Sequence, residues 1–161
     1  MAVDSFLKLE GVDGESSDSV HADEIDVLAW SWGASNSGTM HEARGGGAGK
    51  ANFQDISITK WIDKATPTIW RAVAKGIHYP SGKLTVRKAG GDDPLEYLVI
   101  ELKSIMITST STGGSSGEDR LTENITLNFS EFKINYTPQA ADGTAGAAVD
   151  YGYNIAESKD A

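Results

Sequence analysis

Hydrophobic and polar residues alternate with a period of two along most of this chain, and this pattern restricts it to a mainly β fold. Two long segments, residues 97–109 and 125–136, show the alternation most clearly. The apolar positions change parity within each of them; in the first, Leu102 is followed by Ile105. Without a bulge or a sharp bend, such a strand would expose half of its apolar side chains to water. We therefore expect two bent strands of the kind that form the corners of a closed or nearly closed barrel.

Shorter alternating segments occur around residues 6–10, 56–62, 84–87 and 149–156. Together with the long segments they predict about seven or eight antiparallel strands. The 161 residues fit a single domain spanning residues 1–161. A hydrophobic share of 39% is sufficient for a packed core, so the acidic composition does not indicate disorder.

One segment departs from the β pattern and predicts an α-helix over about residues 66–76, flanking the barrel. Thr66 can cap it, Pro67 suits the first helical position, and Gly76 suits the left-handed position that ends a helix. Apolar residues recur within it at helical spacing: Ile69, Trp70, Val73 and Ile77. We expect this stripe to cover an open side or end of the barrel.

The segment Ile25–Trp32 is apolar on both faces of a predicted strand. Ile25, Val27 and Ala29 share one parity, whereas Leu28, Trp30 and Trp32 share the other. Antiparallel strands normally present one face to solvent. The second face is therefore expected to lie either under the helix or in a subunit interface.

Charge and composition exclude several classes of function. The net charge of −9 argues against binding of nucleic acid, which requires a positive field, and against docking on an anionic membrane. The chain has no cysteine, which excludes disulfides, thiolate metal sites and a cysteine nucleophile. The first residues lack the features of a secretory signal, and no apolar run approaches the ~20 residues of a membrane helix. We therefore expect synthesis in the cytoplasm, no cleavable signal peptide and no membrane insertion.

A long predicted loop, Gly33–Ala51, contains a glycine-rich run that resembles a phosphate-binding loop. The resemblance fails because Arg44 occupies the position of the first glycine and Ala51 replaces the Ser or Thr that would bind magnesium. The residues that follow have strand periodicity, so no helix N-terminus could receive a phosphate. No nucleotide or other cofactor is predicted.

Catalytic and metal-binding patterns are also missing from the sequence. Asp92 and Asp93 precede Pro94 and predict a β-turn rather than a calcium loop, and no G-x-S-x-G motif supports a serine triad. The carboxylates of Glu118 and Asp119 could act as a pair, but neutralisation by Arg120 on the surface or across an interface is the better interpretation. The histidines are dispersed and form no metal-ligand motif: His21, His41 and His78. A non-enzymatic protein is therefore expected.

Several segments in this order resemble the Hcp family, the haemolysin-coregulated proteins of the bacterial type VI secretion system. The resemblance extends from Phe6 to Ile155, and the segments that carry it are 23–33, 45–50, 59–67, 84–91 and 111–124. The sequence differs at a few positions from the residues that are usual in the family. Trp61 stands in place of Tyr, Trp70-Arg71 in place of small or aliphatic residues, and Tyr153 in place of Trp.

The resemblance implies a β-barrel with a flanking helix that assembles into a hexameric ring with a wide lumen. In the family, rings stack into the inner tube within a contractile sheath, hold effectors in the lumen and are ejected into a neighbouring cell. The implied partners are further copies of this chain, effectors, and the sheath and spike proteins. The implied location is the bacterial cytoplasm, followed by secretion.

The resemblance also suggests particular residues. Ser31 matches a position that the family places toward the lumen, where effectors bind. The candidates for subunit contact or ring stacking are Trp30, Trp32, Gly45, Gly46, Gly47, Gly49, Lys50, Glu118, Asp119 and Arg120. The alternative hypothesis is a small-ligand or carbohydrate-binding barrel whose pocket would be lined by tryptophans, namely Trp30, Trp32, Trp61 and Trp70.

Overall fold

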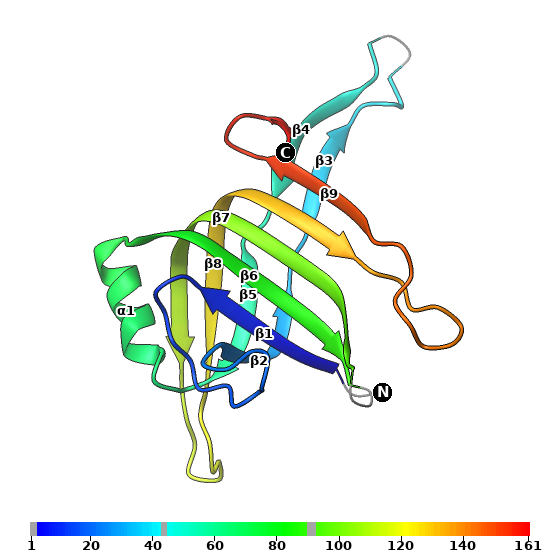
Figure 1. The fold of residues 1–161 in the computed structure, drawn as a ribbon. Coiled ribbons are helices and arrows are strands. Elements are labelled where there is room, and N and C mark those ends of the chain that lie inside the picture. The colour runs from blue at the N-terminus through cyan, green and yellow to red at the C-terminus, as the bar shows by residue number, and fades with distance from the viewer. Residues whose placement is uncertain (1–2, 43–44, 90–92) are drawn as a thin grey trace.

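The structure is a computed structural model, and it describes residues 3–42, 45–89 and 93–161. Within these ranges the chain forms ten strands and one helix (Figure 1). Arg44 and Asp92, which entered the arguments on the glycine run and on the predicted turn, lie outside the described residues. The elements are β1 (Val3–Leu9), β2 (Ile25–Ser31), β3 (Ala34–Gly38), β4 (Ala48–Phe53), β5 (Ile56–Trp61), α1 (Thr66–Lys75), β6 (His78–Lys88), β7 (Leu95–Thr112), β8 (Thr122–Tyr136), β9 (Val149–Asn154) and β10 (Lys159–Asp160).

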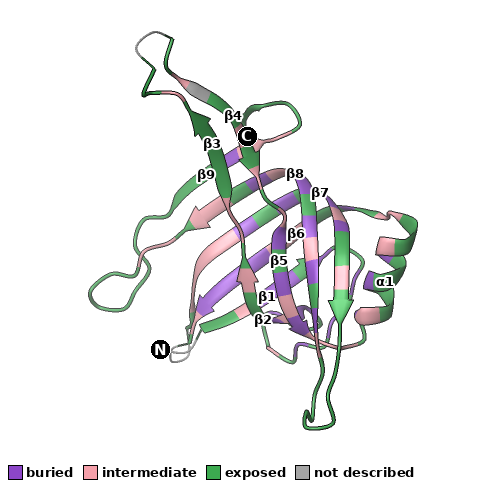
Figure 2. Ribbon diagram, turned by 180° about the vertical axis from the view of Figure 1, so that it is seen from behind, coloured by how far each residue is buried: buried purple, intermediate pink, exposed green. Residues whose placement is uncertain are grey.

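Six of the strands close into a barrel, which confirms the predicted fold class. The order β8-β5-β2-β1-β6-β7 is closed by pairing of β7 with β8, and all of these pairings are antiparallel. Strands β9 and β10 extend the same sheet beyond β8. Purple, buried positions run along the barrel strands in Figure 2, whereas the β7–β8 loop and most of the loop before β9 are green and exposed.

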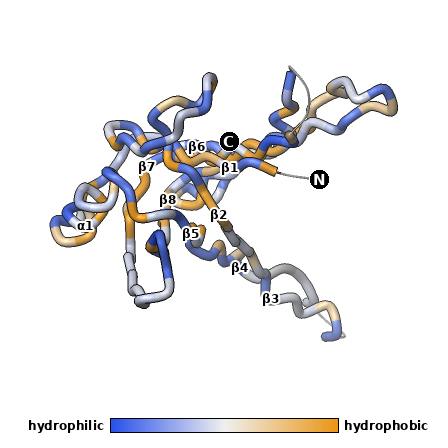
Figure 3. Tube along the Cα trace, turned by 90° about the horizontal axis from the view of Figure 1, so that it is seen from below, coloured by the Kyte–Doolittle hydropathy of each residue, from blue (hydrophilic) through white to orange (hydrophobic). Residues whose placement is uncertain are grey.

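The segment expected as the loop Gly33–Ala51 is instead a two-stranded arm formed by β3 and β4. Figures 1 and 3 show this arm projecting away from the barrel. Apolar and polar residues do not alternate in these two strands, because their residues are mostly small or polar and are exposed rather than half-buried.

Both long strands bend at the same level of the barrel, as their changes of parity predicted. Ser104 in β7 has a left-handed φ of 52° and lies opposite Ser130 of β8, between the pairs Lys103–Glu131 and Ile105–Phe129. The register continues across this point, so the change of parity is a bend rather than a bulge. The bulge lies further along, between Ile107 and Ser109.

The helix begins and ends as expected, but two details of the prediction were wrong. Thr66 is the first helical residue and does not cap it, because its hydroxyl bonds to Asp63 and Glu123 instead. Trp70 is 47% exposed, so only Ile69 and Ala72 are fully buried against the barrel. Gly76 ends the helix with a φ of 63°, as predicted. No helix in the described part of the chain is long and apolar enough to cross a membrane.

The faces predicted for the segment Ile25–Trp32 were also wrong, because β2 carries a bulge between Val27 and Ala29. The bulge exposes Leu28 and Ala29 and returns Trp30 to the core side, where Trp30 and Trp32 pack partly against the core. This strand therefore does not have two continuous apolar faces.

Candidate functional site

Part of the barrel wall presents a smooth, uncharged outer face formed by β2, β5, β8 and the end of β7. The strand registers align its outward residues in two rows. One row contains Ser31, Ser57, Thr126 and Ser109, and the next contains Ala29, Thr59, Asn124 and Ser111. We call these eight residues the hydroxyl face, and Ser31, the predicted effector-binding residue, lies exposed within it.

Hydrogen bonds between side chains connect the strands across this face. The Thr59 hydroxyl donates to Asn124 Oδ1 at 2.7 Å, and the hydroxyls of Ser109 and Thr126 lie 2.6 Å apart. Asp55, at the edge of the face, accepts hydrogen bonds from Thr108 at 2.6 Å and from Asn128 at 2.9 Å. Such a surface offers many donors and acceptors but neither of its rows contributes a charge.

Of the eight residues of the hydroxyl face, only Ser31 was predicted from the sequence as a site residue. A signal for the others was present, because Ser, Thr and Asn recur with a period of two between the buried residues of β5 and β8. Their common face could not be predicted from this signal, since it depends on the register between four strands and on the bulges in β2 and β7.

The sheet that carries the hydroxyl face has an open edge on each side. β7 pairs with β6 only as far as Met106, and β2 pairs with β1 only over residues 25–27. Among the described pairings, residues 107–112 of β7 and 28–31 of β2 therefore bond to one neighbouring strand each. Open edges present unpaired backbone groups that can pair with another chain.

The other predicted site residues are not brought together. The glycine-rich run lies at the tip of the arm and along β4, whereas the loop with Glu118, Asp119 and Arg120 projects from the opposite end of the barrel (Figure 1). The Arg120 guanidinium lies over the ring of Trp61 at 4.6 Å from its centroid. Within the described part of this chain Arg120 thus makes a cation–π contact and no ion pair with Glu118 or Asp119, and its predicted role across an interface stays a prediction.

The four tryptophans of the alternative hypothesis do not line one pocket. Trp32 packs against the rings of Phe53, Phe129 and Phe132, with centroids 4.9 to 6.5 Å away. Trp70 projects outward from α1, and Trp61 is covered by Arg120. In the described ranges, no group of three or more metal-ligand side chains is placed to hold a metal ion.

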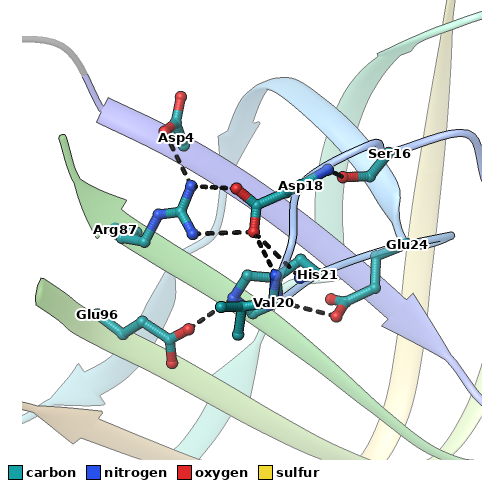
Figure 4. A network of polar contacts seen from close by, with 8 residues as sticks. All are labelled: Asp4, Ser16, Asp18, Val20, His21, Glu24, Arg87 and Glu96. Carbon is teal, nitrogen blue, oxygen red and sulfur yellow. Dashed lines mark hydrogen bonds and ion pairs between the residues drawn. The ribbon is translucent and has the colours of Figure 1, made fainter. Parts of the chain in front are cut away.

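A polar network that was not predicted from the sequence attaches the loop between β1 and β2 to the barrel (Figure 4). His21 is only 3% exposed, and its two ring nitrogens lie 2.8 Å from Glu24 and 2.6 Å from Glu96. Its ring stacks on Phe6 at 4.5 Å between centroids. The network therefore joins this loop to β1 and, through Glu96, to β7.

Arg87 completes this network with a bidentate ion pair to Asp18. The distances from its two terminal nitrogens to the carboxylate oxygens are 2.7 and 3.0 Å. This guanidinium holds the pKa of Asp18 well below its usual range, and the backbone N–H groups of Val20 and His21 add to the effect. The charged carboxylate is therefore the form that holds the loop.

We expect Asp18→Asn to destabilise the protein most at neutral pH. The folded-state pKa of Asp18 is depressed, so its contribution is present above the unfolded-state value of about 4 and is lost as the pH falls below it. Urea unfolding at several pH values should show a difference in the free energy of unfolding between wild type and variant, and this difference should become smaller below about pH 4. Glu42→Gln, on the exposed turn of the arm, is the control. A gap that stays constant down to pH 2 would contradict this role.

A second network, with a fully buried ion pair at its centre, lies at the start of α1. Lys60 and Glu123 are both 0% exposed, and Lys60 Nζ lies 2.5 Å from Glu123 Oε1. The same ammonium donates to the Trp61 carbonyl at 2.8 Å and to Asp63 at 2.9 Å. Thr66 donates to the same Glu123 oxygen at 3.1 Å. These bonds tie β5, β8 and the beginning of the helix together.

Comparison with known proteins agrees with this architecture. A family model described as type VI secretion system effector, Hcp, matches residues 6–136. The chain is 59% identical over 159 residues to protein hcp1 of Pseudomonas aeruginosa, with 98% of each chain covered. Among solved structures, a type six secretion system protein superimposes with a TM-score of 0.93 at 31% identity, covering 99% of this chain and all of that one. Hcp1 from Salmonella typhimurium superimposes with a TM-score of 0.84 at 35% identity, covering both chains completely.

The fold and these matches define a type VI secretion system protein with a closed β-barrel. The extent of the family match and the identity to a relative over nearly the whole chain establish the family. The chain belongs to the Hcp family.

Proposed function

We propose that this chain is a non-enzymatic, secreted subunit of the type VI inner tube, which forms hexameric rings that stack and carry effectors in their lumen. The observation that carries the proposal is the hydroxyl face with an open strand edge on each side. Six such faces side by side would form a continuous wall around a lumen, because each open edge could continue into a neighbour.

The chemistry of the hydroxyl face supports contact with folded cargo of varied sequence. Its short side chains give a level surface, and many of their hydrogen bonds are already satisfied across the strands. A surface without charge in its rows does not select or repel cargo by the sign of its charge. The net charge of −9 is consequently carried by the rest of the chain.

Electron microscopy and native mass spectrometry of the purified protein test the proposal directly. Both should show closed rings of six copies at micromolar concentration. A monodisperse monomer over the same range would overturn it.

We expect Ser31→Gln to weaken cargo retention while leaving rings intact. The longer side chain would project from the β2 side of the hydroxyl face and disturb its level surface. The measurement is the amount of cargo protein that co-purifies with rings from the native host, which should fall several-fold. Lys83→Gln, on the outer face of β6, is the matched control and should retain cargo. Equal retention by both variants would remove the hydroxyl face from the cargo site.

A further inference from the structure

His21 lies between two carboxyl groups, which only accept hydrogen bonds when they are ionised (Figure 4). Its ring nitrogens lie 2.8 Å from Glu24 Oε2 and 2.6 Å from Glu96 Oε1. Both are hydrogen-bond distances, so each contact needs a proton between its two atoms. A neutral imidazole carries only one ring proton, and the lone pair of its second nitrogen would face a negatively charged oxygen. The three side chains therefore make both contacts only when they share one proton more than a neutral histidine and two carboxylates contain.

Burial makes this shared proton important for Glu24 in particular. Glu24 is 8% exposed, and among the described residues its second carboxylate oxygen has no hydrogen-bond partner. Loss of the shared proton would leave a buried carboxylate without a counter-charge, which is strongly destabilising. The side chain of Glu96 is 34% exposed, so water can hydrate its charge.

The other charged groups around His21 are already paired with one another. Asp18, on the same loop, accepts the backbone N–H of His21 and forms the bidentate ion pair with Arg87 of β6. Asp4 of β1 lies 3.3 Å from the same guanidinium, which in turn lies over the ring of Phe6, the stacking partner of His21. Two carboxylates and one guanidinium sum to one negative charge, so these groups do not repel the shared proton.

We propose that the shared proton makes the cluster of His21, Glu24 and Glu96 a pH-sensitive latch, which holds the loop of residues 10–24 on the barrel. An unpaired histidine is neutral above about pH 6.5, so in that range the closed loop binds more protons than the open loop. Attachment of the loop therefore weakens as the pH rises. The ion pair of Asp18 behaves in the opposite way, because it is lost only in acid. The latch lies within a single chain, so it does not depend on the proposed ring.

Hydrogen–deuterium exchange of the full chain at about pH 6 and about pH 9 tests the latch. The backbone N–H groups of Asp23 and Glu24 donate to carbonyl groups within the loop, at 2.9 and 3.2 Å, and report whether the loop is closed. After correction for base catalysis of exchange, the equilibrium constant for opening should rise at least about tenfold between the two pH values, as expected for loss of a charge-assisted hydrogen bond. The amides of the barrel strands are the internal reference. Equal protection of the loop at both pH values would overturn the proposal.

Glu24→Gln separates the latch from a merely structural role of the cluster. The glutamine amide can donate to the unprotonated ring nitrogen of a neutral His21, so this loop should stay closed at about pH 9. His21→Phe retains an aromatic ring but carries no proton, so its loop should be open at both pH values. Glu101→Gln, exposed on the same strand as Glu96, is the matched control and should keep the wild-type pH dependence. A wild-type pH dependence in Glu24→Gln, or a closed loop in His21→Phe, would show that the shared proton does not hold the loop.

Discussion

Replacing Lys60 by Ala should lower the free energy of unfolding by about 3–5 kcal/mol, because it leaves the carboxylate of Glu123 buried without its counter-charge. Both side chains are inaccessible to solvent, and the second carboxylate oxygen of Glu123 has no hydrogen-bond partner within the protein. The measurement is urea unfolding followed by tryptophan fluorescence, at a concentration where the chain is monomeric.

The matched control is Lys64→Ala, four residues further along. Lys64 is exposed and lies 3.9 Å from Asp23, so its loss should cost less than about 1 kcal/mol. Replacing both buried partners, with Lys60→Met and Glu123→Leu, should recover most of the stability, because no isolated charge remains inside. If Lys60→Ala were as stable as the control Lys64→Ala, this result would show that water reaches Glu123 and that the network is dispensable.

Trp32→Ala should cost about 3 kcal/mol of unfolding free energy in the isolated chain, because the indole closes an aromatic cluster over the end of the barrel. Trp32 contacts Phe53, Phe129 and Phe132, and its indole N–H donates to the Gln54 carbonyl at 2.8 Å. Denaturation of the monomer measures this effect without any contribution from assembly.

Trp70→Ala is the informative comparison for Trp32. Its side chain projects from α1, so the monomer should change by no more than about 0.5 kcal/mol. If Trp32 acted only in a subunit interface, as the sequence suggested, both variants would leave the monomer equally stable. Loss of stability in Trp32→Ala alone would assign that side chain chiefly to the fold.

Much of the barrel could be predicted from the sequence because burial of one strand face imposes a regular pattern. The changes of parity correctly predicted bends in β7 and β8. Pro67 and Gly76 correctly indicated where the helix begins and ends. The bulge at Leu28 could not be predicted, since apolar residues on both sides of it conceal the shift of register. The arm was missed because neither of its strands buries a face.

The buried ion pair left a signal that could have been recognised. Lys60 continues the alternation of Ile56 and Ile58, and Glu123 precedes Ile125 and Leu127 with the same period. Opposite charges in phase with core residues on two strands indicate a buried pair. The network around His21 left no such signal, because Glu96 lies far from the loop in sequence and only the fold brings them together.

In the proposed ring, the arm formed by β3 and β4 has a consequence for how subunits would come together. An isolated two-stranded hairpin is marginally stable in water, and this one contributes few apolar contacts beyond Phe53 to the barrel. Its backbone amides should therefore exchange with deuterium rapidly in a lone chain and slowly once another surface covers them. The arm would then become ordered as a neighbouring subunit binds. The conformational entropy that the hairpin loses in this step raises the protein concentration required for assembly.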